Sequence, residues 1–206
     1  MPGLGLDGRS LKDVAALIPL SVVLLPGMGL GRPVPTLDAL AERLLTELGE
    51  GPVVLLGHSQ SCQIVVAAAE RDARVVGVVL VGPTTDPRLR SALGLTWRWL
   101  ATAIGEPWWQ VPRIVAQWWS TGPRAMVALW RGAAPDRIDE RIRRLTVPVV
   151  VVRGRRDRLC ANDWAQHLAS VAPQGRLFEL PGVAHMAVQT APAEVAGIVR
   201  QLGAGY

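Results

Sequence analysis

The feature that most constrains the fold is a series of short apolar runs that end at Gly or Pro. Four uncharged runs of this kind, rich in Val and Leu, occupy residues 21–25, 53–56, 75–81 and 147–152. Because these runs lack the alternation of apolar and polar residues, we expect strands that are buried on both faces, as in a parallel sheet. A further strand is expected at residues 176–180.

Segments with helical periodicity separate these runs. Helices are expected at residues 11–18, 36–48, 63–70, 163–171 and 193–202. Alternating strands and helices predict an α/β fold with a mostly parallel sheet flanked by helices. With 50% hydrophobic residues, the chain of 206 residues can bury a sizeable core. In such a sheet, the loops at the carboxyl ends of the strands build the functional site.

One strand leads into a turn typical of a catalytic serine. The run at residues 53–56 continues as Gly57-His58-Ser59-Gln60-Ser61 and then as a small-residue helix. A serine in a sharp strand-to-helix turn exposes its hydroxyl above the sheet edge. Gln60, which follows Ser59, is expected to aim its backbone N–H at a developing oxyanion. The usual pattern is G-x-S-x-G, and this chain departs from it with Ser61 in the last position.

A serine nucleophile needs a base, and the base needs an acid that orients it. His185 follows the strand expected at residues 176–180, and Asp157 follows the run at residues 147–152. Both side chains should therefore meet Ser59 at the same edge of the sheet. The predicted catalytic residues are Ser59, Asp157 and His185.

Other residues compete for these roles. His58 precedes the nucleophile and is expected to point away from it and to shape the pocket. His167 lies within an expected helix, where a surface or core role is more common. Asp86 follows the run at residues 75–81 and is the main rival to Asp157 as the acid.

These motifs resemble those of the serine α/β-hydrolase family over essentially the whole chain. The resemblance is carried by Gly57-His58-Ser59-Gln60, by the loop at residues 153–157 and by residues 181–185. It implies an acyl-enzyme mechanism without a metal or an organic cofactor. The three His and two Cys also lack the spacings of common metal sites. The substrate is not implied, because this fold hosts many chemistries.

The family takes a second oxyanion N–H from the residue after a Gly that ends an early strand. Leu4, in Pro2-Gly3-Leu4, and Met28, in Pro26-Gly27-Met28, both occupy such a position. The family places a helix, a strand and a second helix between this loop and the nucleophile strand, and only the longer separation of Gly3 from Ser59 leaves room for them. Leu4 is therefore favoured, with Met28 as the alternative.

This assignment leaves the chain without the N-terminal strands of the family. The nucleophile strand would then have an unpaired edge. Three explanations are open: a start upstream of Met1, a shift of the strand at residues 21–25 to the nucleophile strand, or a partner chain at this edge. We favour the first for the biological protein. For a protein made only from Met1 we expect the second, which would bring Met28 to the site.

Residues 85–145 are expected to form a helical lid inserted before the strand that leads to Asp157, with residues 1–84 and 146–206 as the core. Seven of the eight Trp lie in this segment, together with ten Arg and five acidic residues, which account for the net charge of +5. We expect two or three of these Trp to line an apolar pocket over Ser59. Arg interleaved with Trp also suits single-stranded nucleic acid, but we do not favour that partner.

The predicted function is that of a serine hydrolase acting on an ester, lactone or thioester of a fairly hydrophobic small molecule. One alternative is a lyase, a cyclase or a C–C bond hydrolase that uses the same triad beneath a water-excluding lid. Another is a catalytically weak binding module. We expect no membrane span and a cytoplasmic location, and the exposed strand edge makes a homodimer one of the options.

Overall fold

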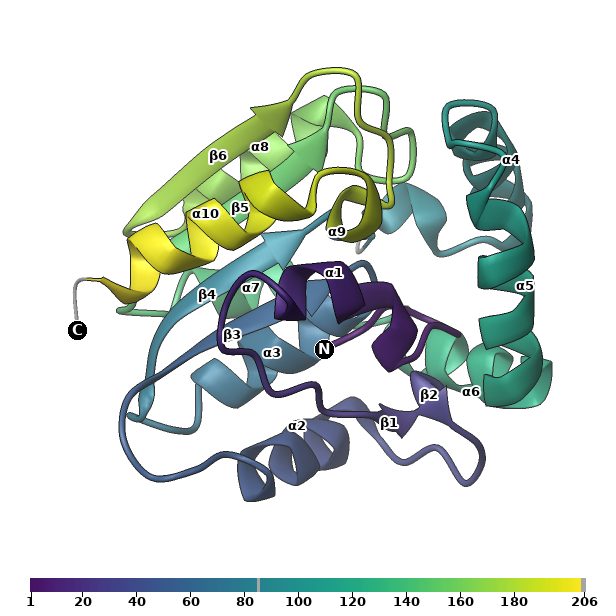
Figure 1. The fold of residues 1–206 in the computed structure, drawn as a ribbon. Helices are drawn as coiled ribbons and strands as arrows, with labels where there is room; N and C mark the ends of the chain where they lie inside the picture. Colours follow the sequence, from purple (N-terminus) through teal and green to yellow (C-terminus); the bar gives the residue numbers. More distant parts are fainter. Residues whose placement is uncertain (85, 205–206) are drawn as a thin grey trace.

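The sheet of the computed structural model, which describes residues 1–84 and 86–204, consists of four parallel strands. Their order is β3-β4-β5-β6, so each strand pairs with the next one along the chain (Figure 1). The strands are β3 (Val53–His58), β4 (Val75–Val81), β5 (Val149–Gly154) and β6 (Gly175–Leu180). The predicted α/β class and parallel sheet are confirmed.

Both faces of this sheet are covered, which explains why the strand sequences are uncharged. In β4, Val78 and Leu80 join one apolar cluster, whereas Val79 and Val81 join a second cluster on the opposite face. The first cluster is closed by α2 (Leu37–Thr46), α3 (Ser61–Ala69), α7 (Ile138–Ile142) and α8 (Asn162–Val171). The second is closed by a 3-10 helix (Gly8–Leu11), α1 (Lys12–Ala15), α9 (Ala187–Thr190) and α10 (Pro192–Gly203).

The strand expected at residues 21–25 is a wrong prediction. Only Leu25–Pro26 forms a short strand, β1, which pairs with β2 (Gly29–Leu30) outside the main sheet. The edge of β3 is used instead by Met1, whose amine donates to the Leu56 carbonyl at 2.6 Å. The Met1 carbonyl accepts from the His58 N–H at 3.2 Å. Because these backbone groups are already paired, the expected shift of residues 21–25 to the nucleophile strand does not occur.

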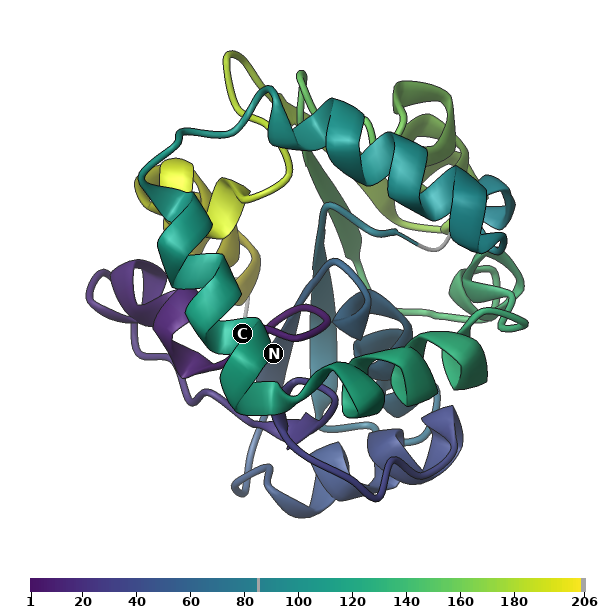
Figure 2. The same ribbon diagram turned by 90° about the vertical axis from the view of Figure 1, so that its right-hand side faces the viewer.

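Three helices lie across the carboxyl ends of the strands. They are α4 (Ala92–Ala103), α5 (Gln110–Thr121) and α6 (Pro123–Ala133), preceded by a 3-10 helix at Pro87–Leu89. Figure 2 shows these helices framing the face of the molecule that looks toward the viewer. Within the described residues, no helix has both the length and the hydropathy needed to cross a bilayer.

The last residues of the segment predicted as a lid, 138–145, pack into the core. Ile138 and Ile142 of α7, and Leu145 after it, are buried in the apolar cluster that also contains Ile64 of α3. The helix α7 contacts both α3 and α8, so its apolar face is part of the core. Residue 85, where the lid was expected to begin, lies outside the described residues.

Candidate active site

Ser59 occupies a strained turn between β3 and α3. Its φ of 58° makes it the only non-glycine residue with a positive φ among the described residues. Such a conformation costs an L-residue on the order of 1–3 kcal/mol and persists where its surroundings enforce it. Here the Ser59 N–H donates to the Val81 carbonyl at 2.8 Å. A Cβ atom at Gly57 would lie 2.8 Å from Val65 Cγ2 and 2.9 Å from Cys62 Cα, so glycine lets α3 pack tightly against the turn.

Ser61, which replaces the usual glycine of the motif, closes the turn with its hydroxyl. The oxygen Oγ accepts from the His58 N–H at 2.8 Å. It also lies 2.9 Å from the His58 carbonyl and 3.1 Å from the Met1 carbonyl, to either of which it can donate. The departure from the family pattern therefore adds hydrogen bonds at this turn instead of opening it.

Asp157 and His185 form a buried pair at the ends of β5 and β6. His185 Nδ1 lies 2.8 Å from Asp157 Oδ2. The other carboxylate oxygen of Asp157 accepts from the N–H groups of Leu159 at 2.8 Å and Cys160 at 3.0 Å. A Cβ atom at Gly82 would stand 3.0 Å from His185 Nδ1, so the pair packs against bare backbone. Asp157 thus accepts three hydrogen bonds, and the one from His185 orients the imidazole.

The pKa values of His58 and His185 are shifted in opposite directions. Burial disfavours the charged form of His185, but the Asp157 carboxylate outweighs burial and raises the pKa of His185 above its usual value. Burial and the nearby charge of His185 lower the pKa of His58 to about 3. A neutral His58 can donate from Nε2 to the His185 carbonyl, 3.2 Å away. His58 therefore supports the loop of the predicted base and does not compete for its role.

The other competing residues are paired elsewhere. Asp86 is buried and binds the Arg88 guanidinium, with the shortest N···O distance at 2.6 Å. Arg88 also bridges to Asp163 at 2.9 Å on the surface of α8. His167 stacks on Trp164, with ring centroids 5.5 Å apart. These contacts give Asp86 and His167 structural partners away from His185.

Ser59 and His185 line one cavity of about 360 Å³ beneath the lid helices. Three Trp line it, namely Trp99, Trp118 and Trp130, and Trp99 and Trp118 lie 5.3 Å apart by ring centroids. Most of the remaining lining side chains are apolar. In the cavity, Ser59 Oγ lies 3.3 Å from the hydroxyl of Thr84, a residue that the sequence analysis did not single out.

The two predicted oxyanion positions differ sharply. Leu4 lines the cavity, and the loop before it touches the turn, since a Cβ atom at Gly3 would stand 3.0 Å from Ser59 Cβ. The Leu4 N–H has no acceptor among the described residues. Met28 is fully buried in the core, and its N–H donates to the Leu25 carbonyl at 2.8 Å. The geometry thus brings Leu4, and not Met28, to the side of Ser59.

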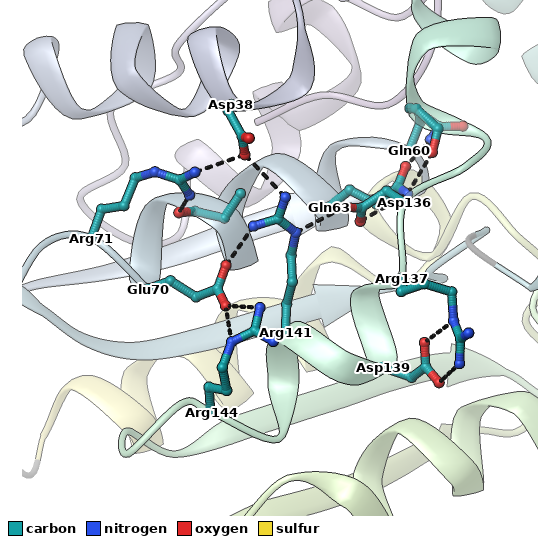
Figure 3. Close-up of polar contacts among 12 residues, drawn as sticks. Asp38, Gln60, Gln63, Glu70, Arg71, Asp136, Arg137, Asp139, Arg141 and Arg144 are labelled. Atoms are coloured by element: carbon teal, nitrogen blue, oxygen red, sulfur yellow. Dashed lines mark hydrogen bonds and ion pairs between the residues drawn. The ribbon is translucent and has the colours of Figure 1, made fainter.

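Gln60 also lines the cavity, and its side chain begins a polar chain that runs to the surface (Figure 3). The Gln60 amide donates to Gln63, whose own amide donates to Asp136 Oδ2 at 3.2 Å. Arg141 then donates to Asp136 Oδ1 at 2.7 Å and to Glu70 at 2.6 Å. This chain ties the start and end of α3 to the segment that follows the lid, which holds the turn and the lid base together.

Glu106, between α4 and α5, is a cavity residue that the sequence analysis missed. Its Oε1 accepts from the N–H of Met186, next to His185, at 2.7 Å. Its Oε2 is buried without a partner among the described residues, and burial raises the pKa of this carboxyl. The available signal was that Glu106 is the sole acidic residue of segment 92–133. No three His, Cys, Asp or Glu side chains within residues 1–84 and 86–204 gather as a metal site would require.

The fold has close counterparts among solved structures. A thermophilic esterase superposes with a TM-score of 0.77 at 19% identity, covering 97% of this chain and 86% of the esterase. MenH from S. aureus superposes with a TM-score of 0.75 at 14% identity, covering 98% of this chain and 92% of MenH. An N-acyl homoserine lactone degrading enzyme gives 0.73 at 16% identity, with 95% and 90% covered.

The sequence itself gives a family match. A search of curated proteins finds no match. The model of the alpha/beta hydrolase family, however, matches residues 2–198 and so takes in the strained serine turn and the loops of Asp157 and His185. The chain belongs to the alpha/beta hydrolase family.

Proposed function

We propose that the protein is a serine hydrolase that cleaves a fairly hydrophobic ester, lactone or thioester through an acyl-enzyme. The observation that carries this proposal is that Ser59, on its strained turn, and His185, which is paired with Asp157, line the same apolar cavity. The proposed nucleophile, base and acid come from the ends of three different strands, which lie at the same edge of the parallel sheet.

In the proposed first step, Ser59 Oγ attacks the acyl carbonyl carbon while His185 Nε2 takes the hydroxyl proton. The Asp157 carboxylate stabilises the imidazolium. The N–H groups of Gln60 and Leu4 hold the negative oxygen of the tetrahedral intermediate, and His185 returns the proton to the leaving group. Water then attacks the acyl-Ser59 ester with His185 as the base, which releases the acid and restores the hydroxyl.

The Ser59 hydroxyl lies against Thr84 in the unliganded site. Hydrogen bonds of catalytic groups often become short and aligned only when substrate is bound, so this arrangement is compatible with the proposed role. Thr84 then provides a resting partner for the hydroxyl before attack.

The lining of the cavity supports a hydrophobic substrate. Trp99, Trp118 and Trp130 face the site together with aliphatic side chains, and Glu106 is the only acidic residue among those that line the cavity. Burial of apolar substrate surface contributes about 25 cal/mol per Å², which favours acyl or alcohol groups with several carbon atoms. That an esterase and a lactone-degrading enzyme share the fold is consistent with this choice.

The test is covalent labelling with a fluorophosphonate, followed by turnover of aryl esters of increasing chain length. We expect the wild type to be labelled and Ser59→Ala not to be, and we expect kcat/KM to rise with chain length until the cavity is filled. Ser170→Ala is the control, since it removes an exposed hydroxyl of α8, away from the site, and should still be labelled. A wild type that resists the probe would instead indicate a binding module.

The apolar roof also favours a second candidate, in which the same triad catalyses elimination or cyclisation because water is kept out. Turnover in ¹⁸O-labelled water separates the two candidates. Hydrolysis places the label in the released acid, whereas an unlabelled product would support the second candidate.

A further inference from the structure

The outer face of α4 carries an apolar stripe that residues 1–84 and 86–204 leave open to solvent. Leu93, Trp97, Leu100 and Ile104 follow one another at intervals of four, three and four residues, which places them along one side of the helix. Their exposed fractions are 83%, 72%, 49% and 89%. Single exposed apolar residues are common, but a contiguous stripe of large ones marks an interaction surface.

A second stripe runs along α5. Trp108, Val111, Val115 and Trp119 follow at intervals of three, four and four residues and are 53% to 84% exposed. Val111 and Val115 also line the cavity, so this stripe passes the cavity mouth. The two helices frame the same face of the molecule in Figure 2. We call the eight residues of the two stripes the lid face.

The segment that carries the lid face is positively charged. Residues 92–133 contain four Arg and a single acid, Glu106, which lines the cavity. None of these four Arg forms an ion pair with a carboxylate among the described residues. Two of them, Arg124 and Arg131, line a shallow hollow on α6 together with Arg32 and the half-exposed Val127.

We propose that the lid face docks on an anionic phospholipid surface. The Trp and aliphatic side chains of the two stripes would enter the boundary between headgroups and acyl chains, as in helices that lie in a membrane interface. Arg32, Arg124 and Arg131 would bind headgroup phosphates, for which guanidinium groups are well suited. A helix that lies on the surface in this way needs no membrane span.

The same observations argue against two other occupants. A second copy of the chain would place like charges against one another across the interface, which disfavours a face-to-face dimer of lids. Single-stranded nucleic acid would use the Arg and Trp residues, but it has no counterpart for aliphatic stripes built from Leu93, Leu100, Ile104, Val111 and Val115. A lipid surface matches the apolar stripes and the charge together.

Docking in this orientation would open the cavity toward the lipid, because Val111 and Val115 belong both to the lid face and to the lining of the cavity. The second part of the inference, which rests on the proposed function, is that the substrate is an ester dissolved in the lipid layer. It would then pass from the acyl region to Ser59 without crossing water.

The test is co-sedimentation of the full chain with vesicles of phosphatidylcholine alone and of phosphatidylcholine mixed with phosphatidylglycerol. We expect binding to the mixed vesicles, a blue shift of Trp fluorescence on binding, and weakening by salt. The double variant Trp97→Gln/Ile104→Gln should lose about 100-fold in partitioning, because two large side chains no longer leave water. Arg124→Gln/Arg131→Gln should lose about 30-fold, at about 1 kcal/mol per Arg.

The control is Leu17→Gln/Arg200→Gln, which changes one exposed Leu and one exposed Arg away from the lid and should bind as the wild type does. Ser59→Ala should also bind the mixed vesicles as the wild type does. Vesicle binding can therefore be judged even if the proposed enzymatic function proves wrong. The inference is overturned if the wild type ignores the mixed vesicles, binds both vesicle types equally, or is matched in its losses by the control. A dimer that the Trp97→Gln/Ile104→Gln variant converts to monomer without any vesicle binding would assign the face to a second copy. Binding of a single-stranded oligonucleotide instead of vesicles would assign it to nucleic acid.

Discussion

The cavity lies between two regions that differ in how they are stabilised. We call the strand ends that carry Ser59, Asp157 and His185 the floor, and the helices α4 and α5 with the loop between them the roof. In the floor, Asp157 accepts three hydrogen bonds, Ser59 donates its N–H to β4, and Ser61 closes the turn. In the roof, α4 and α5 expose large apolar side chains to solvent. Single hydrogen bonds spread along these helices tie them to the core, such as those of Thr102 with Arg158 and of Thr121 with Gly5. If the proposed function holds, the reacting groups are positioned by buried hydrogen bonds, whereas the space for the substrate is shaped by apolar side chains of the helices above them.

The largest effect should come from the floor, with Asp157→Asn. The amide cannot hold the correct tautomer of His185 or stabilise its charged form, so kcat should fall about 10⁴-fold. The wild-type kcat/KM should decline as the pH falls through the raised pKa of His185, because the base must be neutral to accept a proton. In Asp157→Asn this acidic limb should move to lower pH, since the carboxylate that raises the pKa is gone. An unchanged pH profile would contradict the pairing.

Two Gly→Ala substitutions compare the rigidity of the two regions. A Cβ atom at Gly154, at the end of β5, would stand 2.2 Å from the Ala184 carbonyl oxygen, so the backbone must move and the free energy of unfolding should drop by about 3 kcal/mol. At Gly132 in α6 a Cβ atom meets nothing within 4 Å, and Ala should add up to about 1 kcal/mol. Denaturant unfolding measures the free energy of unfolding of both variants. Similar effects at the two positions would contradict the difference in rigidity between the strand ends and the helices above them.

Glu106→Gln probes the hydrogen bond that joins the roof to the loop of His185. The amide oxygen can still accept from the Met186 N–H, but the negative charge near His185 is lost. The acidic limb of kcat/KM should therefore shift to lower pH, because Glu106 contributes to the raised pKa of His185. The plateau rate should fall by about fivefold, as expected when a charged acceptor becomes neutral. A plateau change without a shift of the limb would restrict Glu106 to a positioning role.

The smallest effect is expected at the outer surface of the roof. Trp108 is 83% exposed, so Trp108→Ala should change the free energy of unfolding by less than about 0.5 kcal/mol. Turnover of a water-soluble ester should also stay as it is in the wild type. A large loss of stability would show that this side chain packs against the protein in solution, and the contrast between floor and roof would weaken.

Much of the floor was predictable because it follows from local patterns. The uncharged runs at 53–56, 75–81 and 147–152 identify strands buried on both faces, and parallel strands place their following loops at one edge. That is why Ser59, Asp157 and His185 could be selected together, although they are far apart in the sequence.

The rest depends on contacts that no local pattern encodes. The run at residues 21–25 has the apolar character of a strand, but a strand also needs a free neighbour, and Met1 already uses the edge of β3. The role of Glu106 depends on the approach of Met186, eighty residues away. The burial of Ile138 and Ile142, within the segment predicted as a lid, depends on the space between α3 and α8.

The positive φ of Ser59 has a consequence for attempts to improve this protein by selection. A left-handed backbone costs an L-residue about 1–2 kcal/mol, and Gly or Asn tolerates it better. A library screened only for heat resistance should therefore enrich Gly or Asn at position 59, whereas a library screened for turnover should discard both. At position 59, thermal stability and catalytic activity therefore favour different residues, and the choice of screen decides which residue is retained.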